Sequence, residues 1–576
     1  MSILVKTVRI AGFRGLENIE VELEQTTILT GMNNTGKTSF LKALQLALGN
    51  RQFISQDDFF IKEESISQEI IIDILIVPAN TDGSEEFSED WEILFTKDRI
   101  QEQENTVQLR TIITFNEITN SYKTDQFILQ DWPEFKQDDI NWFEVEKGKK
   151  TSFNFDEIPF FYMDAQRDIL EDIKLRNSYL GRMLSKMKYS DEDTEEIEIQ
   201  IKALNELAIS RSDILSNIKT TLKELDTAMD TQSEGLEITP FTKKIRDLNK
   251  GLKIYYSDQK EAFPMENHGM GTRSWSSLLT LKAFISLLAN NFRESVFFPI
   301  LAVEEPEAHL HPNAQKRLYE QINSIVGQKI ISTHSPYIAA TAKLEQIRNF
   351  YKDESVTCGR IEINNLTSED VRKINRQVIN TRGEIFFSKL IIFFEGETEE
   401  QALPIFAEEY FNKTPVEMGF DFVGVGGCKS YLPFLRFAEN LHIPWFILSD
   451  AEPEAIKWVK KHFEKCKTSK NINDIIVFLN EGNDFEKQLI NDGFSDEIKQ
   501  AIASFDIYGN EQYRLAKERK RLKEIENFSE EKLYEIITKS KTKYGHTIAE
   551  KIVKSDKNLP PKIIDLFSKI SNILRI

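Results

Sequence analysis

The sequence predicts an α/β protein made of two successive strand-and-helix units, with a long helical insertion inside the first unit and further helices at the C-terminal end. Three observations support this class. A glycine-rich turn at 31–38 separates an apolar strand from a helical run, residues 160–239 contain no proline and two glycines, and a second alternation of strands and helices begins at residue 389. At roughly 150 residues per domain, a chain of 576 residues has room for two to four domains.

Composition and charge restrict the class of protein. Hydrophobic residues make up 40% of the chain and charged residues 29%, which is typical of a globular protein and excludes a disordered or collagen-like chain. The net charge of -20 predicts that any contact with nucleic acid is local and metal-assisted, because a protein that coats nucleic acid is usually basic. Three cysteines without a Cys-x-x-Cys pair, no signal-peptide pattern and no apolar stretch of about 18 residues predict a reduced, cytoplasmic protein with no membrane contact.

The region up to about residue 162 is predicted to be rich in strands. Apolar and polar residues alternate at 5–10 and 20–23, as in half-buried strands, and residues 27–30 form a short buried strand. Residues 68–77 and 107–115 are predicted to be strands as well.

A complete GxxxxGK[ST] motif, Gly31 to Thr38, follows the strand at 27–30 and opens the helical run at 39–48. In that context the motif predicts a phosphate-binding loop, because its glycines let backbone N–H groups and a helix N-terminus face an anion. Lys37 is predicted to hold the outer phosphates of ATP, and Thr38 to ligate Mg²⁺. The predicted nucleotide-binding residues of this loop are Asn33, Asn34, Thr35, Gly36, Lys37, Thr38 and Ser39.

A phosphate-binding loop needs an acidic partner that holds the metal and orients water. The apolar segment 299–303 is predicted to be a buried strand that delivers two carboxylates at its end, Glu304 for the metal side and Glu305 to polarise the attacking water. His334 follows the next predicted strand, 329–332, in a position to sense the γ-phosphate.

Two helical segments carry patterns with more than one interpretation. Apolar residues between 197 and 229 recur at alternating spacings of four and three, with Arg211 as one charged defect. This heptad pattern fits an amphipathic helix packed on its own domain and equally an arm that dimerises. From Arg514 to Lys523 six of ten residues are basic, and a solvated helix face is favoured there over a DNA-contacting one.

The second α/β unit places acidic residues after its predicted strands. Three of these strands are predicted at 390–394, 444–448 and 475–479, and the acids that follow them are, in that order, Glu395 with Glu399, Asp450 with Glu452, and Glu486. Because parallel strands end at one edge of a sheet, these carboxylates are expected to converge. Oxygen ligands without His or Cys predict Mg²⁺ or Mn²⁺, and two such ions suit displacement at a phosphodiester.

Several motifs of the first unit occur in a family order: Gly12-Phe13-Arg14-Gly15, the phosphate-binding loop, the run from Glu304 to Pro312, and Thr333-His334-Ser335. This order resembles the ABC-type ATPase heads of the SMC, RecF and OLD group. The segment from His268 to Ser274 stands where these heads carry a signature that contacts the γ-phosphate held by another subunit. The resemblance implies that Gly271 and Ser274 bind nucleotide and that the protein is a homodimer or a larger assembly, up to a tetramer. Ala165-Gln166-Arg167-Asp168 resembles a further head segment.

Glu395-Gly396-x-Thr398-Glu399, followed by Asp450-x-Glu452, resembles a Toprim domain, which has a Rossmann-like fold. The usual second motif is Asp-x-Asp, where this chain has a Glu. The resemblance implies that Lys543, before a C-terminal helix, stabilises charge on the scissile phosphate. It implies catalysis by Glu395 and Asp450, and metal binding by Glu395, Glu399, Asp450, Glu452 and Glu486.

An ABC-type head followed by a Toprim domain is the architecture of the OLD (overcoming lysogenization defect) family, and the likeness covers nearly the whole chain. Size and domain order are similar to Gabija endonuclease subunits and to retron-associated OLD-like effectors. The resemblance implies an Mg²⁺-dependent DNA nickase or endonuclease, regulated by its ATPase head and used against phage. It also implies a defence partner from a neighbouring gene, either a helicase or a reverse transcriptase with its retron DNA.

The predicted domains follow from these motifs. They are the N-terminal part of the head at 1–165, a helical insertion and candidate dimerisation arm at 166–262, the C-terminal part of the head at 263–352, a linker at 353–384, and the Toprim domain with its C-terminal helices at 385–576. Two alternatives stay open. An ATP-gated, SMC-like DNA-binding or sensor protein would keep an inactive Toprim scaffold, which Glu452 favours. A topoisomerase- or primase-like enzyme is disfavoured, because no DNA-gate domain and no zinc module is recognisable.

Overall fold

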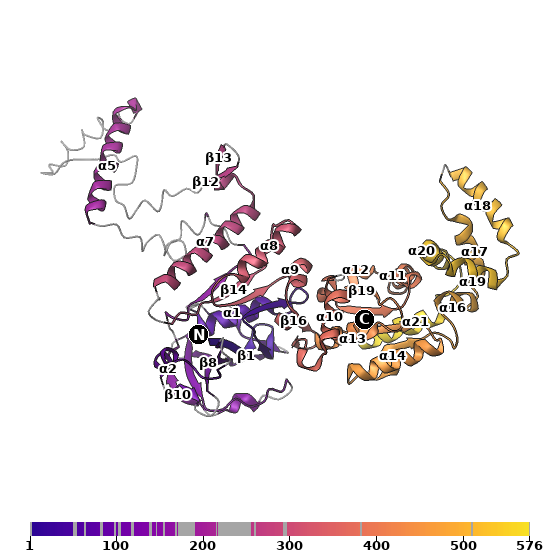
Figure 1. The fold of residues 1–576 in the computed structure, drawn as a ribbon, viewed down its shortest axis with the longest axis horizontal. Coiled ribbons are helices and arrows are strands. Elements are labelled where there is room, and N and C mark those ends of the chain that lie inside the picture. Colours follow the sequence, from indigo (N-terminus) through magenta and orange to yellow (C-terminus); the bar gives the residue numbers. More distant parts are fainter. Residues whose placement is uncertain are drawn as a thin grey trace. The chain divides into compact units, whose positions relative to one another are not determined.

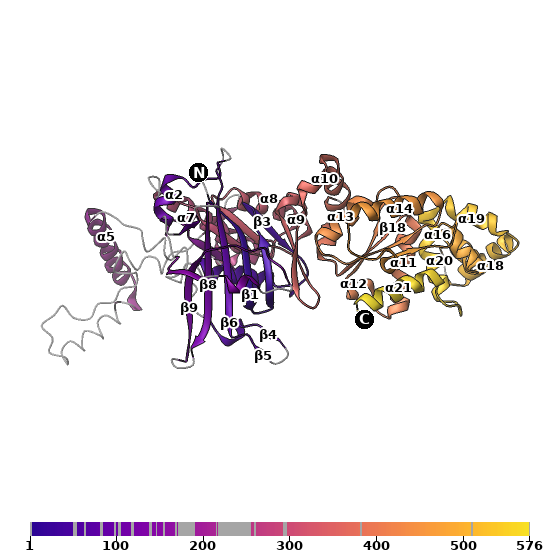
Figure 2. The ribbon, with the colours of Figure 1, turned by 90° about the horizontal axis from the view of Figure 1, so that it is seen from below.

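The structure is a computed structural model. It describes residues 3–49, 54–62, 65–80, 84–96, 99–101, 105–116, 120–137, 141–145, 147–153, 156–166, 170, 191–214, 216, 255–258, 261–291, 296–380, 383–508 and 511–574. Contacts divide the chain into two units (Figures 1 and 2). The first comprises Met1–Tyr162, Ile300–Glu307 and Gln328–Ile576, and the second comprises Met163–Pro299 and Ala308–Gly327.

An antiparallel sheet forms the first part of the head. Its order is β10-β9-β8-β6-β1-β2, with β7 beside β8. The strands are β1 (Ile3–Phe13), β2 (Leu16–Glu22), β6 (Glu69–Pro78), β7 (Ile100–Gln101), β8 (Thr106–Asn116), β9 (Ser121–Leu129) and β10 (Lys147–Thr151). The strands predicted at 5–10, 20–23, 68–77 and 107–115 are confirmed, and most residues of the four strands are buried.

A second, mostly parallel sheet carries the nucleotide motifs. Its order is β11-β14-β15-β3-β16-β17. The strands are β3 (Thr26–Thr30), β11 (Phe160–Met163), β14 (Ile300–Glu304), β15 (Gln328–Ser332), β16 (Ile347–Lys352) and β17 (Val356–Gly359). Strands β14, β15, β3 and β16 run parallel, so segments nearly 300 residues apart in sequence end at one edge. Helix α1 (Lys37–Leu48) follows β3, and α9 (Pro336–Thr341) follows β15.

The C-terminal half contains a four-stranded, fully parallel sheet in the order β19-β18-β20-β21. The strands are β18 (Leu390–Phe394), β19 (Phe420–Gly424), β20 (Trp445–Ser449) and β21 (Ile476–Phe478). Helices α13 (Tyr431–Asn440) and α14 (Pro453–Cys466) lie on one side, and α11 (Glu397–Phe411) and α21 (Pro561–Leu574) on the other (Figure 2). All residues of β18 and β20 are buried, as their unbroken apolar runs predict.

The C-terminal residues are mostly helical, as predicted. Beyond α16 (Phe485–Asn491) the helices are α17 (Ser495–Ser504), α18 (Glu511–Ile525), α19 (Glu530–Thr538) and α20 (Lys541–Val553). Helix α20 packs against α11 and α17, and α19 packs against α16. This group is therefore attached to the helices that start at the carboxyl edge of the parallel sheet.

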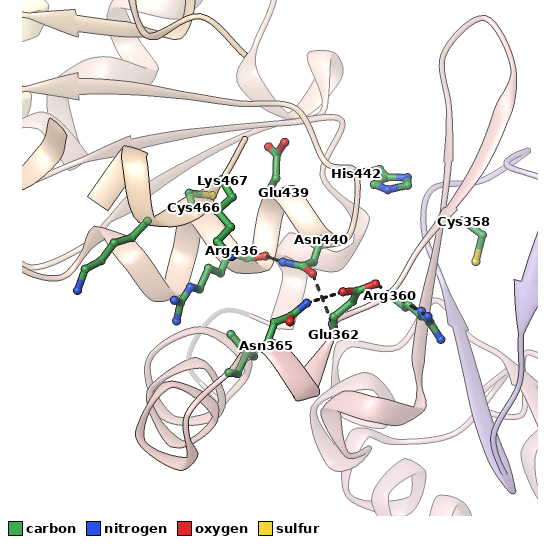
Figure 3. A pocket seen from close by; sticks show the side chains of 12 residues that line it. Cys358, Arg360, Glu362, Asn365, Arg436, Glu439, Asn440, His442, Cys466 and Lys467 are labelled. Carbon is green, nitrogen blue, oxygen red and sulfur yellow. Dashed lines mark hydrogen bonds and ion pairs between the residues drawn. The ribbon is translucent and has the colours of Figure 1, made fainter. Parts of the chain in front are cut away.

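The segment 353–384, predicted as a linker, contains strand β17 and helix α10 (Ser368–Ile374). Gly359 at the end of β17 approaches the loop after α13 so closely that a Cβ atom there would lie 2.6 Å from Leu441 Cα. A pocket of 460 Å³ lies beside this contact (Figure 3). Within it, the Glu362 backbone N–H donates to Oδ1 of Asn440 in α13 at 3.4 Å, so this bond ties the segment after β17 to that helix.

The second unit contains the described part of the insertion. Its elements are α5 (Asp191–Ser210), β12 (Tyr255–Asp258), β13 (Glu261–Pro264), α7 (Met270–Asn291) and α8 (Pro312–Asn323). Along α5, Leu204 on the heptad seam is 50% exposed and Ile209 is buried. The later seam positions, from 215 to 229, and Arg167 lie outside the described residues, so the dimerisation arm stays a prediction. No helix in the described ranges has the length and apolar character needed to cross a membrane.

Candidate nucleotide and metal sites

The phosphate-binding loop connects β3 to α1. Gly31 and Gly36 have φ angles of 121° and 96°, a left-handed conformation that favours glycine. A Cβ atom on Gly31 would lie 2.1 Å from the carbonyl oxygen of Phe350, so no larger residue fits. The loop thus places backbone N–H groups at the N-terminus of a 12-residue helix, where an anion is favoured.

Lys37 lies inside this loop. Its ammonium group donates to the carbonyl oxygens of Gly31 and Met32, both at 2.7 Å. Burial lowers the pKa of Lys37 to about 8, against the opposing effect of the Glu305 and Glu307 charges. The amine is held at the centre of the loop, near the predicted position of the phosphates.

Strand β14 delivers the two predicted carboxylates to the same edge. Glu304 ends the strand and is buried, while the backbone N–H of Glu305 donates to Ser332 of β15 at 2.9 Å. The Glu305 carboxylate lies 3.8 Å from Nε2 of His334. Burial, helped by the Lys37 charge, lowers the pKa of His334 to about 4, so the imidazole is neutral at pH 7. The structure therefore brings Lys37, Glu305 and His334 together.

Sequence reasoning missed Glu307. Its Oε1 accepts hydrogen bonds from Thr333 Oγ1 at 2.8 Å and from the His334 backbone N–H at 2.7 Å. Burial raises the pKa of Glu307. Glu307 thereby fixes the backbone of the loop that carries His334. The repeated acid in Glu-Glu-Pro-Glu was the available signal, but only the fold shows its partners.

The signature-like residues lie on α7 in the second unit. A Cβ atom on Gly271 would lie 2.4 Å from the carbonyl oxygen of His309, and Ser274 is buried. The close approach explains a glycine within the first turn of a helix. Their contact with a nucleotide on another subunit stays a prediction.

The predicted acidic cluster follows three adjacent strands. Glu395 follows β18, Asp450 follows β20, and Glu486 lies in the first turn of α16 after β21. Glu399, in the first turn of α11, reaches back toward the strand end, since its Oε2 would lie 2.7 Å from a Cβ atom on Gly396. Glu399 and Glu486 are both buried.

Hydroxyl groups orient two of these carboxylates. Ser449 Oγ donates to Glu395 at 2.8 Å, and Thr398 Oγ1 donates to Glu486 at 2.6 Å. A third acid, Asp484, accepts from the Tyr534 hydroxyl of α19 at 2.7 Å. Sequence reasoning did not identify these donors. Thr398 lies inside the Glu-Gly-x-Thr-Glu motif, but Tyr534 lies 50 residues from its partner.

Asp450 is the centre of the negative charge. Burial, as the largest cause, together with the charges of Glu399, Glu395, Asp484 and Glu486, raises its pKa to about 9. Among the described residues its buried Oδ1 has no hydrogen-bond donor. A bound cation would satisfy this oxygen and offset the repulsion, so the donor set fits a hard cation such as Mg²⁺ or Mn²⁺. Within the described ranges no three acidic, histidine or cysteine side chains already enclose one point.

Two predicted residues lie at the margin of this cluster. Glu452 is exposed at the N-cap of α14, and its charge contributes to the raised pKa of Glu395, after the effect of burial. The Lys543 ammonium group lies 5.1 Å from the ring centroids of both Phe505 and Tyr544. The assignment of Lys543 to the scissile phosphate therefore stays a prediction.

Comparison with known proteins identifies both halves of the chain. Residues 4–339 match the family described as AAA ATPase domain, and residues 386–451 match the overcoming lysogenization defect protein-like TOPRIM domain. The class is thus a P-loop ATPase joined to a Toprim domain. The chain belongs to the AAA ATPase domain family, and its second match is to the OLD-like TOPRIM domain that the sequence predicted.

Two relatives are similar to most of this chain, and one solved structure is similar to part of it. The OLD nuclease of Thermus scotoductus is 23% identical over 482 residues, which cover 78% of this chain and 82% of that protein. The endonuclease GajA of Bacillus cereus (strain VD045) is 22% identical over 602 residues, covering 99% of this chain and 90% of that protein. The solved C-terminal region of the Burkholderia pseudomallei OLD protein is 20% identical, covers 33% of this chain and 99% of that chain, and has a TM-score of 0.25.

Proposed function

We propose that this protein is an ATP-regulated, divalent-metal-dependent DNA endonuclease or nickase that acts in prokaryotic defence against phage. The observation that carries the proposal is the charge excess at Asp450, where carboxylates that follow three adjacent strands raise the pKa of a buried acid whose Oδ1 has no donor among the described residues. The names of the two relatives, OLD nuclease and endonuclease GajA, support the nuclease class.

The metal site would be formed by Glu395, Glu399, Asp450 and Glu486, with Glu452 at its rim. Bound Mg²⁺ or Mn²⁺ would stabilise the attacking and leaving oxygens at a phosphodiester. The chain's own residues prepare this site. Ser449 and Thr398 fix the rotamers of Glu395 and Glu486, and the parallel sheet fixes the strand ends that carry the acids.

The head would bind ATP and hydrolyse it. Lys37 and the N-terminus of α1 hold the phosphates, with Thr38 and Glu304 on the metal side. Glu305 orients water, and the neutral His334 beside it donates or accepts a hydrogen bond without adding charge. In defence, the protein would act with a partner encoded nearby, a helicase or a reverse transcriptase with its retron DNA.

A plasmid assay tests the nuclease. Purified protein with Mg²⁺ or Mn²⁺ is expected to convert supercoiled plasmid to nicked or linear DNA, and chelation of the metal is expected to stop the reaction. ATP turnover without cleavage under any metal would favour the alternative, an ATP-gated DNA-binding protein with an inactive Toprim scaffold.

A homodimer is expected, because Gly271 and Ser274 would reach a nucleotide held by a second copy. Light scattering should show at least two chains per particle. Substituting Leu204→Lys puts charge on the heptad seam at a side chain that its own chain leaves 50% exposed, and should weaken association. Leu207→Lys, 52% exposed but off the seam, is the control. A monomer at micromolar concentration, with and without ATP, would contradict the dimer.

One buried side chain connects the phosphate-binding loop to the Toprim domain. Asn349 of β16 is 2% exposed. Its Oδ1 accepts from the hydroxyl of Thr30, the residue before Gly31, at 3.0 Å, and its Nδ2 donates to the Leu441 carbonyl at 3.0 Å. This bond chain supports a route by which nucleotide binding would bias the nuclease.

Substituting Asn349→Leu should uncouple the two activities, since it keeps the branching of the side chain and removes both hydrogen bonds. ATP turnover is expected within about twofold of wild type, while DNA cleavage no longer changes when ATP is added. Asn18→Leu is the control, because Asn18 is also buried and accepts from Trp142 Nε1 at 3.0 Å in the antiparallel sheet. A cleavage rate that still responds to ATP in Asn349→Leu would reject this route.

A further inference from the structure

Helix α18 carries strong local positive charge in an acidic protein. Six of the ten residues from 514 to 523 are basic, whereas the whole chain has a net charge of -20. In an acidic protein, a cluster of this kind would usually be neutralised by neighbouring carboxylates. The structure shows whether α18 has such partners.

The helix contributes little to a hydrophobic core. Ile525 is the one residue of α18 that is buried, and Tyr513 and Leu515 are 53% and 47% exposed. Figure 1 shows α18 at the outer end of the C-terminal helices, beyond α17 and α19. Packing therefore does not explain its sequence.

Most of the basic side chains lack acidic partners. Arg521 donates to the Phe505 carbonyl at 2.6 Å and so ties α18 to the end of α17. In the part of the chain that the structure describes, no carboxylate lies within ion-pair distance of the other five, which are Arg514, Lys517, Arg519, Lys520 and Lys523. Their charges face solvent, where an anionic partner would reach them.

Helices α17 and α18 form a hollow of 820 Å³ with an excess of positive charge. Its lining includes the acids Asp496 and Glu526, and the bases Lys499, Arg519, Lys520 and Lys523. Lys499 is held in place by a hydrogen bond to the Glu526 carbonyl at 2.8 Å. Four cations against two carboxylates favour a polyanion over an acidic or a neutral peptide.

The group that carries α18 is attached to the acidic cluster. Helix α17 packs on α20, and α20 packs on α11, whose first turn holds Glu399. Helix α19 packs on α16, which holds Glu486, and Tyr534 of α19 donates to Asp484 at 2.7 Å. A polyanion bound along α18 is therefore held by the same helices that position the metal-site carboxylates.

We propose that α18 and Lys499 form a docking surface for the phosphate backbone of duplex DNA, which holds the substrate beside the acidic cluster. The proposal rests on the nuclease function proposed above. Backbone contacts by Arg and Lys supply affinity without sequence readout, so the surface sets how tightly DNA is held and not which sequence is cut. This replaces the solvated-face interpretation that the sequence alone favours.

The test compares two variants with the same loss of charge. The first is Arg519→Gln, Lys520→Gln and Lys523→Gln together. The second, on α14, is Lys457→Gln, Lys460→Gln and Lys465→Gln, all exposed positions in the same domain. Binding of a labelled duplex oligonucleotide is measured by fluorescence anisotropy in EDTA, so that neither cleavage nor the metal site contributes.

The α18 variant is expected to bind at least about tenfold more weakly, and its slope of log affinity against log salt should fall by about two to three, close to one for each phosphate that its side chains no longer neutralise. The α14 variant should stay within about twofold of wild type. The proposal would be overturned if the α18 variant bound DNA like wild type, or if both variants weakened DNA binding equally. It would also be overturned if the protein bound anionic vesicles through α18 and did not bind DNA there. Plasmid nicking that is unaffected by the α18 variant would leave the nuclease in place and remove the docking surface, whereas a wild-type protein that neither binds nor nicks DNA would reject both.

Discussion

Replacing Asp450 by asparagine is expected to abolish DNA cleavage and, at the same time, to stabilise the metal-free protein. Loss of a metal ligand should reduce cleavage by at least about 100-fold, since even mutation of the residues that hydrogen-bond to metal ligands typically costs about 10–100-fold in metal affinity or activity. Stabilisation follows from the charge around Asp450. Its carboxyl group is buried among Glu399, Glu395, Asp484 and Glu486, and its pKa is raised to about 9. Asparagine has nearly the same shape as aspartate and carries no charge that the neighbouring carboxylates would repel.

The sign of the pH dependence follows from the raised pKa. Folding raises the pKa of Asp450 from an unfolded value of about 3.9, so the folded protein binds the extra proton between pH 4 and about 9. The stability that this proton contributes is fully present below the unfolded pKa and is lost as pH rises through the folded pKa, at most about 1.4 kcal/mol per pH unit. Thermal unfolding in EDTA should therefore show wild type losing stability from pH 5 to pH 9 relative to Asp450→Asn.

Addition of metal ions distinguishes a metal site from a buried carboxyl group that only destabilises the fold. At pH 8, Mg²⁺ or Mn²⁺ should raise the melting temperature of wild type and leave that of Asp450→Asn unchanged. Asp474→Asn, an exposed acid in the same domain, is the control and should behave like wild type in every measurement. If Asp450→Asn nicked plasmid at the wild-type rate, or if the stability of the two proteins had the same pH dependence, the acids would not form the metal site.

The site positions could be predicted because they depend on local pattern and on one topological rule. Apolar runs such as 390–394 form buried strands, and parallel strands end at one edge, so residues at those ends meet. The need of a phosphate-binding loop for an acidic partner associated Lys37 with Glu305, although more than 260 residues separate them. Glu305 and Glu395 directly follow buried strands, and Lys37 begins the helix after one.

Residues that act through a distant partner could not be predicted. Asn349 lies in an ordinary strand sequence, and its bonds to Thr30 and Leu441 exist only after two domains pack. The sequence of strand β17 has the polar character of a linker and was predicted as one, because the strand lies at the edge of its sheet and few of its residues are buried. Helix α7 begins at Met270 although glycines disfavour a helix, and the need for Gly271 comes from the His309 carbonyl beside it.

Substitutions in the nucleotide site are expected to separate ATP binding from hydrolysis. Lys37→Ala removes the ammonium group that lies 2.7 Å from two carbonyl oxygens of the loop. With no cation to meet the outer phosphates, ATP affinity should fall by at least about tenfold. Lys42→Ala, on the same helix α1 but facing the ring of Tyr162, should bind ATP like wild type.

Glu305→Gln should instead keep ATP affinity and slow hydrolysis by about 100-fold or more, because glutamine cannot accept a proton from the water that Glu305 orients. The neighbouring His334 does not replace it as a cationic acid, since burial and the Lys37 charge hold its pKa at about 4. Hydrolysis should consequently be flat from pH 5.5 to 7.5, with no inflection near the usual pKa of histidine. ATP binding by calorimetry and phosphate release under single-turnover conditions measure the two steps separately. Equal turnover by wild type, Lys37→Ala and Glu305→Gln would mean that this loop and strand end do not form the ATPase site, whereas binding without turnover in Glu305→Gln alone assigns the water-orienting role to that carboxylate.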